Sequence, residues 1–168
     1  MKRRHILAFS LFSSVMSLAG CAIQKPVYLF ERSGRFSLIT PNENRKMTAI
    51  NGRFSLRRSS SVITLDLMTP LNGILARIEI TPSNATLTRD FNTPPLVASS
   101  AEELMEQVLG FALPISVLED WLTTRENQIN AYGWTVTILK RTPQGMPSTI
   151  RAQSMMSDIK LLLSIDNE

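Results

Sequence analysis

The chain is poor in the residues that most enzymes use for covalent catalysis. Among 168 residues it contains one cysteine, Cys21, and one histidine, His5. A single cysteine cannot form a disulfide within the chain. The sequence has neither a GxxxxGK[ST] loop nor a GxGxxG turn, so it carries no common nucleotide-binding motif. It also offers no pair of carboxylates with a spacing that defines glycosidase-type acid–base chemistry.

The first twenty residues are typical of a signal peptide. The basic segment Lys2 to Arg4 precedes an apolar stretch, Ile6 to Leu18, that is too short to span a bilayer comfortably. Leu-Ala-Gly then precedes Cys21, which is the arrangement of a lipobox. There the cysteine thiol receives lipid and the peptidase cleaves on its N-terminal side. An uncleaved membrane anchor with an incidental Cys21 is the alternative.

Lipidation at Cys21 would hold the mature protein to a membrane by two or three acyl chains. Asp after the cysteine favours retention in the inner membrane, so Ala22 predicts the outer membrane, with the protein on its periplasmic face. Cleavage also removes His5, which leaves the mature chain without histidine or free thiol. Ser-His-Asp and Cys-His catalysis and Cys/His zinc sites are thereby excluded. We expect no enzyme activity, no metal and no cofactor.

The mature chain has the length and charge of an ordinary single domain. Removing 20 of 168 residues leaves 148, and removing three of the 18 basic residues leaves 15 against 14 acidic ones. The basic excess therefore lies mostly in the signal peptide, and nucleic acid is not an expected partner. We predict a signal peptide over 1–20, a lipidated cysteine and tether over 21–30, and one monomeric domain over 31–168.

Alternating apolar and polar residues predict antiparallel strands in two groups. The first group covers about 32–38, 52–57, 62–68, 74–80 and 85–88, followed by a connection over 91–99. The second group covers about 134–138, 149–155 and 159–165. Such alternation is typical of sheets that bury one face.

Between the two groups the apolar period becomes helical. Ser100 and Glu103 form a capping box, and Gly110 ends the apolar stripe. A second capping box at Ser116 and Glu119 predicts a short helix. Strands and helices do not alternate, so a parallel sheet is not expected. The pattern predicts a mainly β fold: one antiparallel sheet, strongly curved or partly closed, with helices packed against its apolar concave side.

Several short motifs occur in a familiar order. An Arg-x-Gly-Arg-Phe strand ends at Phe36, and Thr-Pro-Leu-Asn-Gly spans 69–73. Leu-Gly-x-x-Leu-Pro-Ile spans 109–115, Leu-x-x-Trp-Leu spans 118–122, and Gly-Trp-x-Val spans 133–136. Their order and spacing cover nearly all of the mature chain. In this respect the sequence resembles the LolB family of outer-membrane lipoprotein receptors.

The resemblance implies both a fold and a function. The fold would be an incomplete antiparallel barrel of about eleven strands, with helices inside and over its mouth. The function would be a receptor that accepts lipoproteins from the periplasmic carrier LolA and inserts them into outer-membrane lipid. It would bind the acyl chains of the cargo in an apolar cavity, without nucleotide. The rival hypothesis is a structural or assembly lipoprotein that binds a protein partner at the envelope.

Apolar residues of the predicted elements are candidates for the cavity lining. Ordinary core packing is the alternative for each, because alternating apolar faces usually fill with side chains. The candidates are Phe36, Leu38, Phe54, Leu56, Ile63, Leu65, Leu67, Ile78, Leu104, Met105, Leu118, Trp121, Trp134 and Val136.

One loop is a candidate for delivery into the membrane. A tight turn would place Leu71 at its tip, where a leucine has no core to bury in. We therefore expect Leu71 to dip into the bilayer while cargo is delivered; a leucine folded back against neighbouring strands is the alternative. The loop consists of Pro70, Leu71, Asn72 and Gly73.

Two charged pairs allow simpler interpretations. Arg57 and Arg58 could meet an acidic patch on the carrier or lipid headgroups, or they could be solvated charges at a strand end. Glu119 and Asp120 lie where a helix is predicted to begin, and acidic residues there are favoured by capping and by the helix dipole.

Overall fold

The computed structural model describes residues 27–42, 46–70, 73–89 and 92–166. The predicted signal peptide and the lipidation site Cys21 lie outside the described residues, as do Leu71 and Asn72 of the predicted delivery loop. In the described part of the chain, no helix combines the length and the apolar character needed to cross a membrane.

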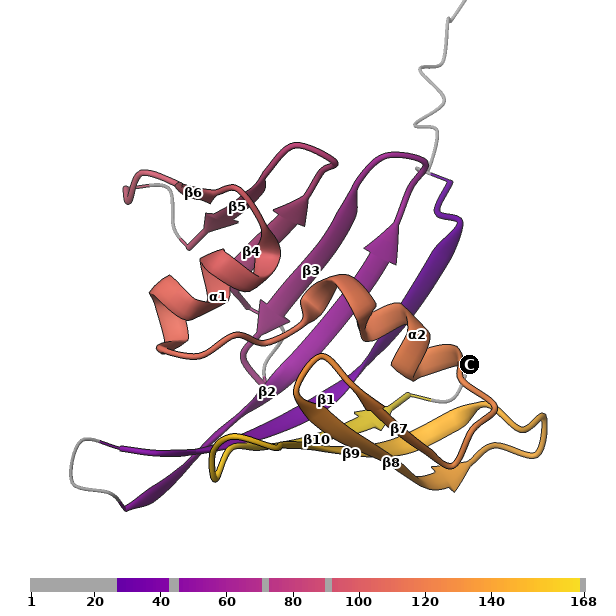
Figure 1. Cartoon of the computed structure of the whole chain (residues 1–168). Helices are drawn as coiled ribbons and strands as arrows, with labels where there is room; N and C mark the ends of the chain where they lie inside the picture. Colours follow the sequence, from indigo (N-terminus) through magenta and orange to yellow (C-terminus); the bar gives the residue numbers. More distant parts are fainter. Residues whose placement is uncertain (1–26, 43–45, 71–72, 90–91, 167–168) are drawn as a thin grey trace, which may run out of the picture.

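Ten strands and three short helical segments make up the described fold (Figure 1). The strands are β1 (Phe30–Pro41), β2 (Met47–Arg58), β3 (Ile63–Met68), β4 (Ile74–Ile80), β5 (Ala85–Thr88), β6 (Leu96–Ala98), β7 (Gln128–Ala131), β8 (Trp134–Arg141), β9 (Pro147–Ser154) and β10 (Lys160–Ile165). The helical segments are α1 (Ala101–Leu109), the 3-10 turn η1 (Ile115–Val117) and α2 (Leu118–Thr123).

All ten strands belong to one antiparallel sheet, in the order β6-β5-β4-β3-β2-β1-β10-β9-β8-β7. The sheet does not close, because β6 and β7 remain at its edges. Figure 1 shows it bending into two halves, with α1 and α2 on the inner side. The predicted mainly β, incomplete and strongly curved barrel is confirmed, with ten strands in the described residues where the resemblance implied about eleven.

The strands that the sequence pattern missed are short or begin early. β6 lies inside the predicted connection, and its Leu96 and Val97 are both exposed, so no alternation marks it. β7 is four residues long and pairs only with β8. β1 begins at Phe30, within the predicted tether, because its first residues pair with the end of β2. Pairing with a neighbour, rather than a burial pattern, defines these segments.

The first helix begins and ends as predicted. The backbone N–H of Glu103 donates to the Ser100 hydroxyl over 3.1 Å, and Gly110 adopts a left-handed conformation with φ of 78°. The second predicted capping box is wrong. Ser116 lies inside η1, and its hydroxyl donates instead to the carboxylate of Glu102 on α1. The residue before α2 is instead Val117, which caps it with no side-chain hydrogen bond.

Two glycines face two phenylalanines at the middle of the sheet. Register places Gly34 of β1 opposite Phe54 of β2, and Phe36 of β1 opposite Gly52 of β2. A Cβ at Gly34 would lie 2.3 Å from the Ser164 carbonyl oxygen and 2.9 Å from the Phe54 ring. A Cβ at Gly52 would lie 2.8 Å from the Phe36 ring. Only glycine permits this close approach of strands and rings where the sheet bends.

We predict that Gly34→Ala destabilises the fold by about 2 kcal/mol or more, because β10 backbone must move to admit the new methyl group. Gly73→Ala is the matched control, since the nearest atom to its added Cβ is the Thr69 hydroxyl at 3.3 Å. It should change stability by less than about 0.5 kcal/mol. Urea unfolding of both variants tests this; equal stabilities would show that the close packing at Gly34 is unimportant.

Candidate functional site

An apolar cavity lies between the concave face of the sheet and the helical segments. Its volume is about 170 Å³. The sheet wall comes from β1 to β5 and β10, and the opposite wall from α1, η1 and α2. Nineteen of the described residues line it: Phe36, Leu38, Ile50, Phe54, Leu65, Leu67, Ala76, Ile78, Leu87, Arg89, Met105, Val108, Leu109, Leu113, Ile115, Leu118, Leu122, Leu161 and Leu163.

The structure brings eight of the fourteen candidate residues together in this wall. The strand pairing aligns them, since register places Leu67 opposite Phe54 and Leu65 opposite Ile78. The eight are Phe36, Leu38, Phe54, Leu65, Leu67, Ile78, Met105 and Leu118. Six candidates do not line the cavity and pack in the core or against it: Leu56, Ile63, Leu104, Trp121, Trp134 and Val136.

Several wall residues were not among the candidates. Leu161 and Leu163 alternate in the last predicted strand, but their place in the wall depends on pairing between β10 and β1, the two ends of the domain. Val108 and Leu109 belong to the predicted apolar stripe of α1. The alternation in the last strand and the helical stripe of α1 could have identified these four residues. Neither pattern marks Arg89.

The other half of the concave side is filled rather than hollow. Trp121 of α2 packs against Trp134 of β8, with ring centroids 6.3 Å apart. Both are almost fully buried, and Val136, Ile150 and Ala152 beside them are buried as well. Two indole rings occupy the space here. The candidates Trp121, Trp134 and Val136 in this half are therefore core. The cavity lies in the other half, under α1, η1 and the Leu118 and Leu122 side chains of α2.

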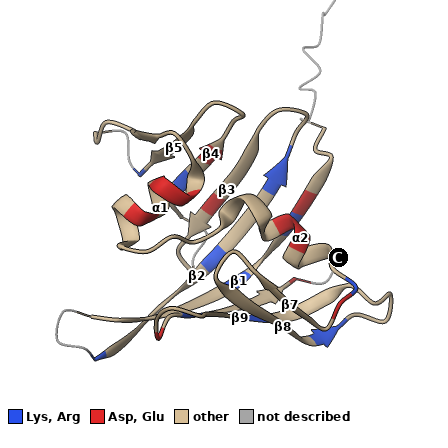
Figure 2. Ribbon diagram, in the orientation of Figure 1, with Lys and Arg blue, Asp and Glu red and all other residues tan. Residues whose placement is uncertain are grey.

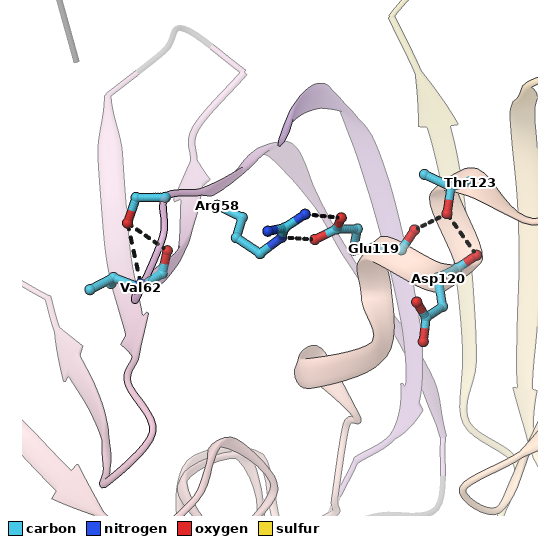
Figure 3. Close-up of polar contacts among 6 residues, drawn as sticks. Arg58, Val62, Glu119, Asp120 and Thr123 are labelled. Carbon is cyan, nitrogen blue, oxygen red and sulfur yellow. Dashed lines mark hydrogen bonds and ion pairs between the residues drawn. The ribbon is translucent and has the colours of Figure 1, made fainter. Parts of the chain in front are cut away.

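An ion pair ties α2 to the sheet. From the end of β2, the Arg58 guanidinium donates to both carboxylate oxygens of Glu119 in the first turn of α2, over 2.6 and 2.9 Å (Figure 3). This two-pronged hydrogen bond, and then the Glu119 charge, raise the pKa of Arg58 above its usual value. The Thr123 hydroxyl also donates to the Glu119 carbonyl oxygen. The pair holds α2 across the sheet at the filled end of the concave side.

A second charge cluster lies on the outer face of the sheet. Asp66 of β3 accepts hydrogen bonds from Arg57 of β2 and Arg77 of β4, and it is buried beneath them. Hydrogen bonding to Asp66 raises the pKa of Arg77. The ring of Tyr28 lies 5.2 Å from the Arg57 guanidinium. Figure 2 shows where Lys and Arg (blue) and Asp and Glu (red) occur along the strands and helices.

The two arginines of the predicted Arg57–Arg58 pair thus point to different partners. Arg57 bonds to Asp66 on the outer face, while Arg58 bonds to Glu119 on the inner side, as expected for successive residues of a strand. The interpretation as two solvated charges is wrong, because both side chains are committed to carboxylates. Glu119 and Asp120 do lie in the first turn of α2, as predicted.

The predicted delivery loop connects β3 to β4. The backbone N–H of Thr69 donates to the Gly73 carbonyl over 2.8 Å, and the Gly73 N–H donates to the Thr69 hydroxyl over 3.1 Å. These bonds close the base of the loop, and Pro70 and Gly73 are exposed. The next residues, Ile74 and Leu75, are 54% and 55% exposed although they point to opposite faces of β4. Both faces of this corner are therefore apolar and open to solvent.

We predict that the filled and hollow halves respond differently to truncation. Trp121→Ala should cost about 3–5 kcal/mol, because it empties a packed site. Leu67→Ala should cost distinctly less, about 1–2 kcal/mol, because Leu67 already borders empty space and is only partly buried. Urea unfolding monitored by circular dichroism gives both values. A Leu67→Ala cost as large as that of Trp121→Ala would mean that the hollow is closed in solution.

A family model and several known proteins are similar to this sequence over most of its length. The profile of the family "Outer membrane lipoprotein LolB" matches residues 29–166. A protein of Bordetella pertussis named outer-membrane lipoprotein LolB is 37% identical over 128 residues, which are 73% of this chain and 64% of the relative. The chain thus spans somewhat less than two thirds of that relative.

Relatives from a second genus match over a longer range. The outer-membrane lipoprotein LolB of Cupriavidus metallidurans is 34% identical over 160 residues, covering 90% of this chain and 75% of the relative. That of Cupriavidus necator is 33% identical over 161 residues, covering 81% of each. The family match over residues 29–166 includes the strands and helices that enclose the cavity. The chain belongs to the LolB family of outer-membrane lipoproteins.

Proposed function

We propose that this protein is a lipoprotein receptor of the outer membrane. It accepts lipoproteins from the periplasmic carrier LolA, holds their acyl chains in the apolar cavity and inserts them into outer-membrane lipid. The observation that carries the proposal is the hollow itself: nineteen of the described residues line it, and one of these nineteen is charged. A domain whose only task was to bind a protein partner would gain stability by filling that space.

The acyl chains of the cargo determine what such a receptor must provide. Each methylene moved from water into an apolar site contributes about 0.8 kcal/mol, so an exposed long chain is strongly unfavourable. The concave sheet supplies rigid apolar walls, and α1 covers them with Met105 and Val108. Methionine adapts to chains of different shape because its side chain is flexible. The cavity can therefore replace the carrier as a dry environment for the cargo.

Direction would come from affinities rather than from nucleotide hydrolysis. The sequence has no nucleotide-binding motif, so each transfer must be downhill from carrier to receptor and from receptor to bilayer. A difference of about 1.4 kcal/mol gives a tenfold ratio of occupancies, so small steps are sufficient. Family membership supports an outer-membrane location, where an anchor on Cys21 would keep the cavity close to its destination.

The transfer reaction itself tests the proposal. A lipoprotein bound to purified LolA is incubated without nucleotide with the soluble form, residues 22–168, which is then recovered by affinity pull-down. We expect the cargo to move onto the receptor. If circular dichroism shows a folded domain but the cargo stays on the carrier, the receptor function fails and a structural lipoprotein that binds a protein partner becomes the better account.

The loop at Leu71 is proposed to act in the last step. Leu71→Glu should still accept cargo from the carrier but deposit it poorly in liposomes, because a carboxylate at position 71 would resist entry into the bilayer. Leu139→Glu is the control, since Leu139 is an exposed leucine of β8, remote from the loop in the strand order. It should deposit cargo normally. Normal deposition by Leu71→Glu would remove the loop from the mechanism.

A further inference from the structure

Arg89 is the one charged side chain in the wall of the apolar cavity among the described residues. It follows the last residue of β5, Thr88, and as a whole it is exposed. Arginine in such a position lays its methylene stem along an apolar surface and keeps its guanidinium in water. The stem therefore belongs to the wall, and the charge lies at the mouth.

Strand register supports this placement. Leu87 pairs with Ile78, and both line the cavity. Because side chains alternate along a strand, Arg89 shares the concave face with Leu87. Thr88, the last residue of β5, pairs with Arg77, so the following residue, Arg89, lies level with Ala76. Ala76 also lines the cavity. Arg89 thus ends a row of wall residues at the edge of the hollow.

The Arg89 guanidinium also has no hydrogen-bond or ion-pair partner among the described residues. Arg57 and Arg77 share the Asp66 carboxylate, Arg58 binds Glu119, and Arg53 binds Asp166. Arg89 takes part in no hydrogen bond or ion pair within the described ranges. A guanidinium beside an apolar cavity can bind an anionic group when its N–H donors are free. The apolar chain attached to that group would then lie in the cavity.

We infer that Arg89 forms a headgroup subsite at the mouth of the cavity, where it binds the anionic oxygens of an acylated ligand whose chain lies inside. The inference rests on the proposed acyl-binding role of the cavity and adds a preference for anionic amphiphiles over neutral ones. A guanidinium offers five N–H donors in a planar fork that matches a carboxylate or a phosphate. A fatty acid and an acidic phospholipid both present this chemistry.

The test compares two ligands that differ only in their head. The full chain is reconstituted into phosphatidylcholine nanodiscs and labelled with photoactivatable myristic acid or with the corresponding alcohol. Mass spectrometry measures the labelling of cavity residues, and the ratio of acid to alcohol is compared between variants. Comparing ratios removes differences in how the two ligands partition into the disc.

Arg89→Met keeps an unbranched stem and removes the charge, so the acid-to-alcohol ratio should fall about threefold to tenfold while alcohol labelling is retained. Arg89→Lys should keep most of the preference. Arg151→Gln removes an exposed arginine of β9 that does not line the cavity, and it should leave the ratio unchanged. An unchanged ratio in Arg89→Met overturns the subsite. Absence of alcohol labelling in the original protein would instead overturn the acyl-binding cavity.

Phosphatidylglycerol in the discs separates the two sources of the anionic head. If it competes with myristic acid in the original protein and not in Arg89→Met, the subsite is supported with a lipid phosphate as its ligand. If it does not compete, while the acid preference still depends on Arg89, the subsite is supported with a free carboxylate as its ligand.

Discussion

Curvature at the middle of the sheet is the constraint on which the remaining structure depends. Gly34 and Gly52 let the rings of Phe54 and Phe36 lie directly against neighbouring backbone, in a place where any larger residue would collide with it. The same two rings form part of the cavity wall. A flat sheet could bury its apolar face under two helices. A sheet this curved encloses more apolar volume than α1, η1 and α2 can fill.

The helices divide that volume unequally. α2 carries Trp121, which packs on Trp134 and fills one half, and the Arg58–Glu119 ion pair holds the helix there. α1 faces the other half with leucine, valine and methionine, which leave a hollow. The filled packing thus lies at β8, β9 and α2, whereas the hollow lies largely under α1. Such a division lets a small domain keep an empty cavity without losing its fold.

The position of the hollow supports the proposed transfer of acyl chains to the membrane. Antiparallel pairing brings the start of β2, the end of β3, the start of β4 and the end of β5 to the same end of the sheet. This end therefore carries the β3–β4 loop, the exposed Ile74 and Leu75, and Arg89. Membership in a family of outer-membrane lipoproteins supports the location that the lipobox predicts. The apolar cavity wall, Arg89 at the mouth, and the exposed Ile74 and Leu75 then lie in this order along the path proposed for an acyl chain.

Apolar periodicity was enough to predict the class of fold, because a period of two and a period of 3.6 are local properties of the chain. It placed most strands, the Ser100 cap and the Gly110 end of α1. It also identified eight wall residues, since alternation reveals which residues share a face. It could not separate cavity from core, because Leu56 and Leu65 carry the same signal and only the packing of α1, η1 and α2 over the sheet decides which of them borders the hollow. Three other features likewise depended on segments distant in the chain. They are the ion pairs of Arg57 and Arg58, the bonding of Ser116 to Glu102 instead of a capping role, and the place of Arg89 in the cavity wall. Tertiary structure decided these points because each depends on what lies across the sheet, which local periodicity does not encode.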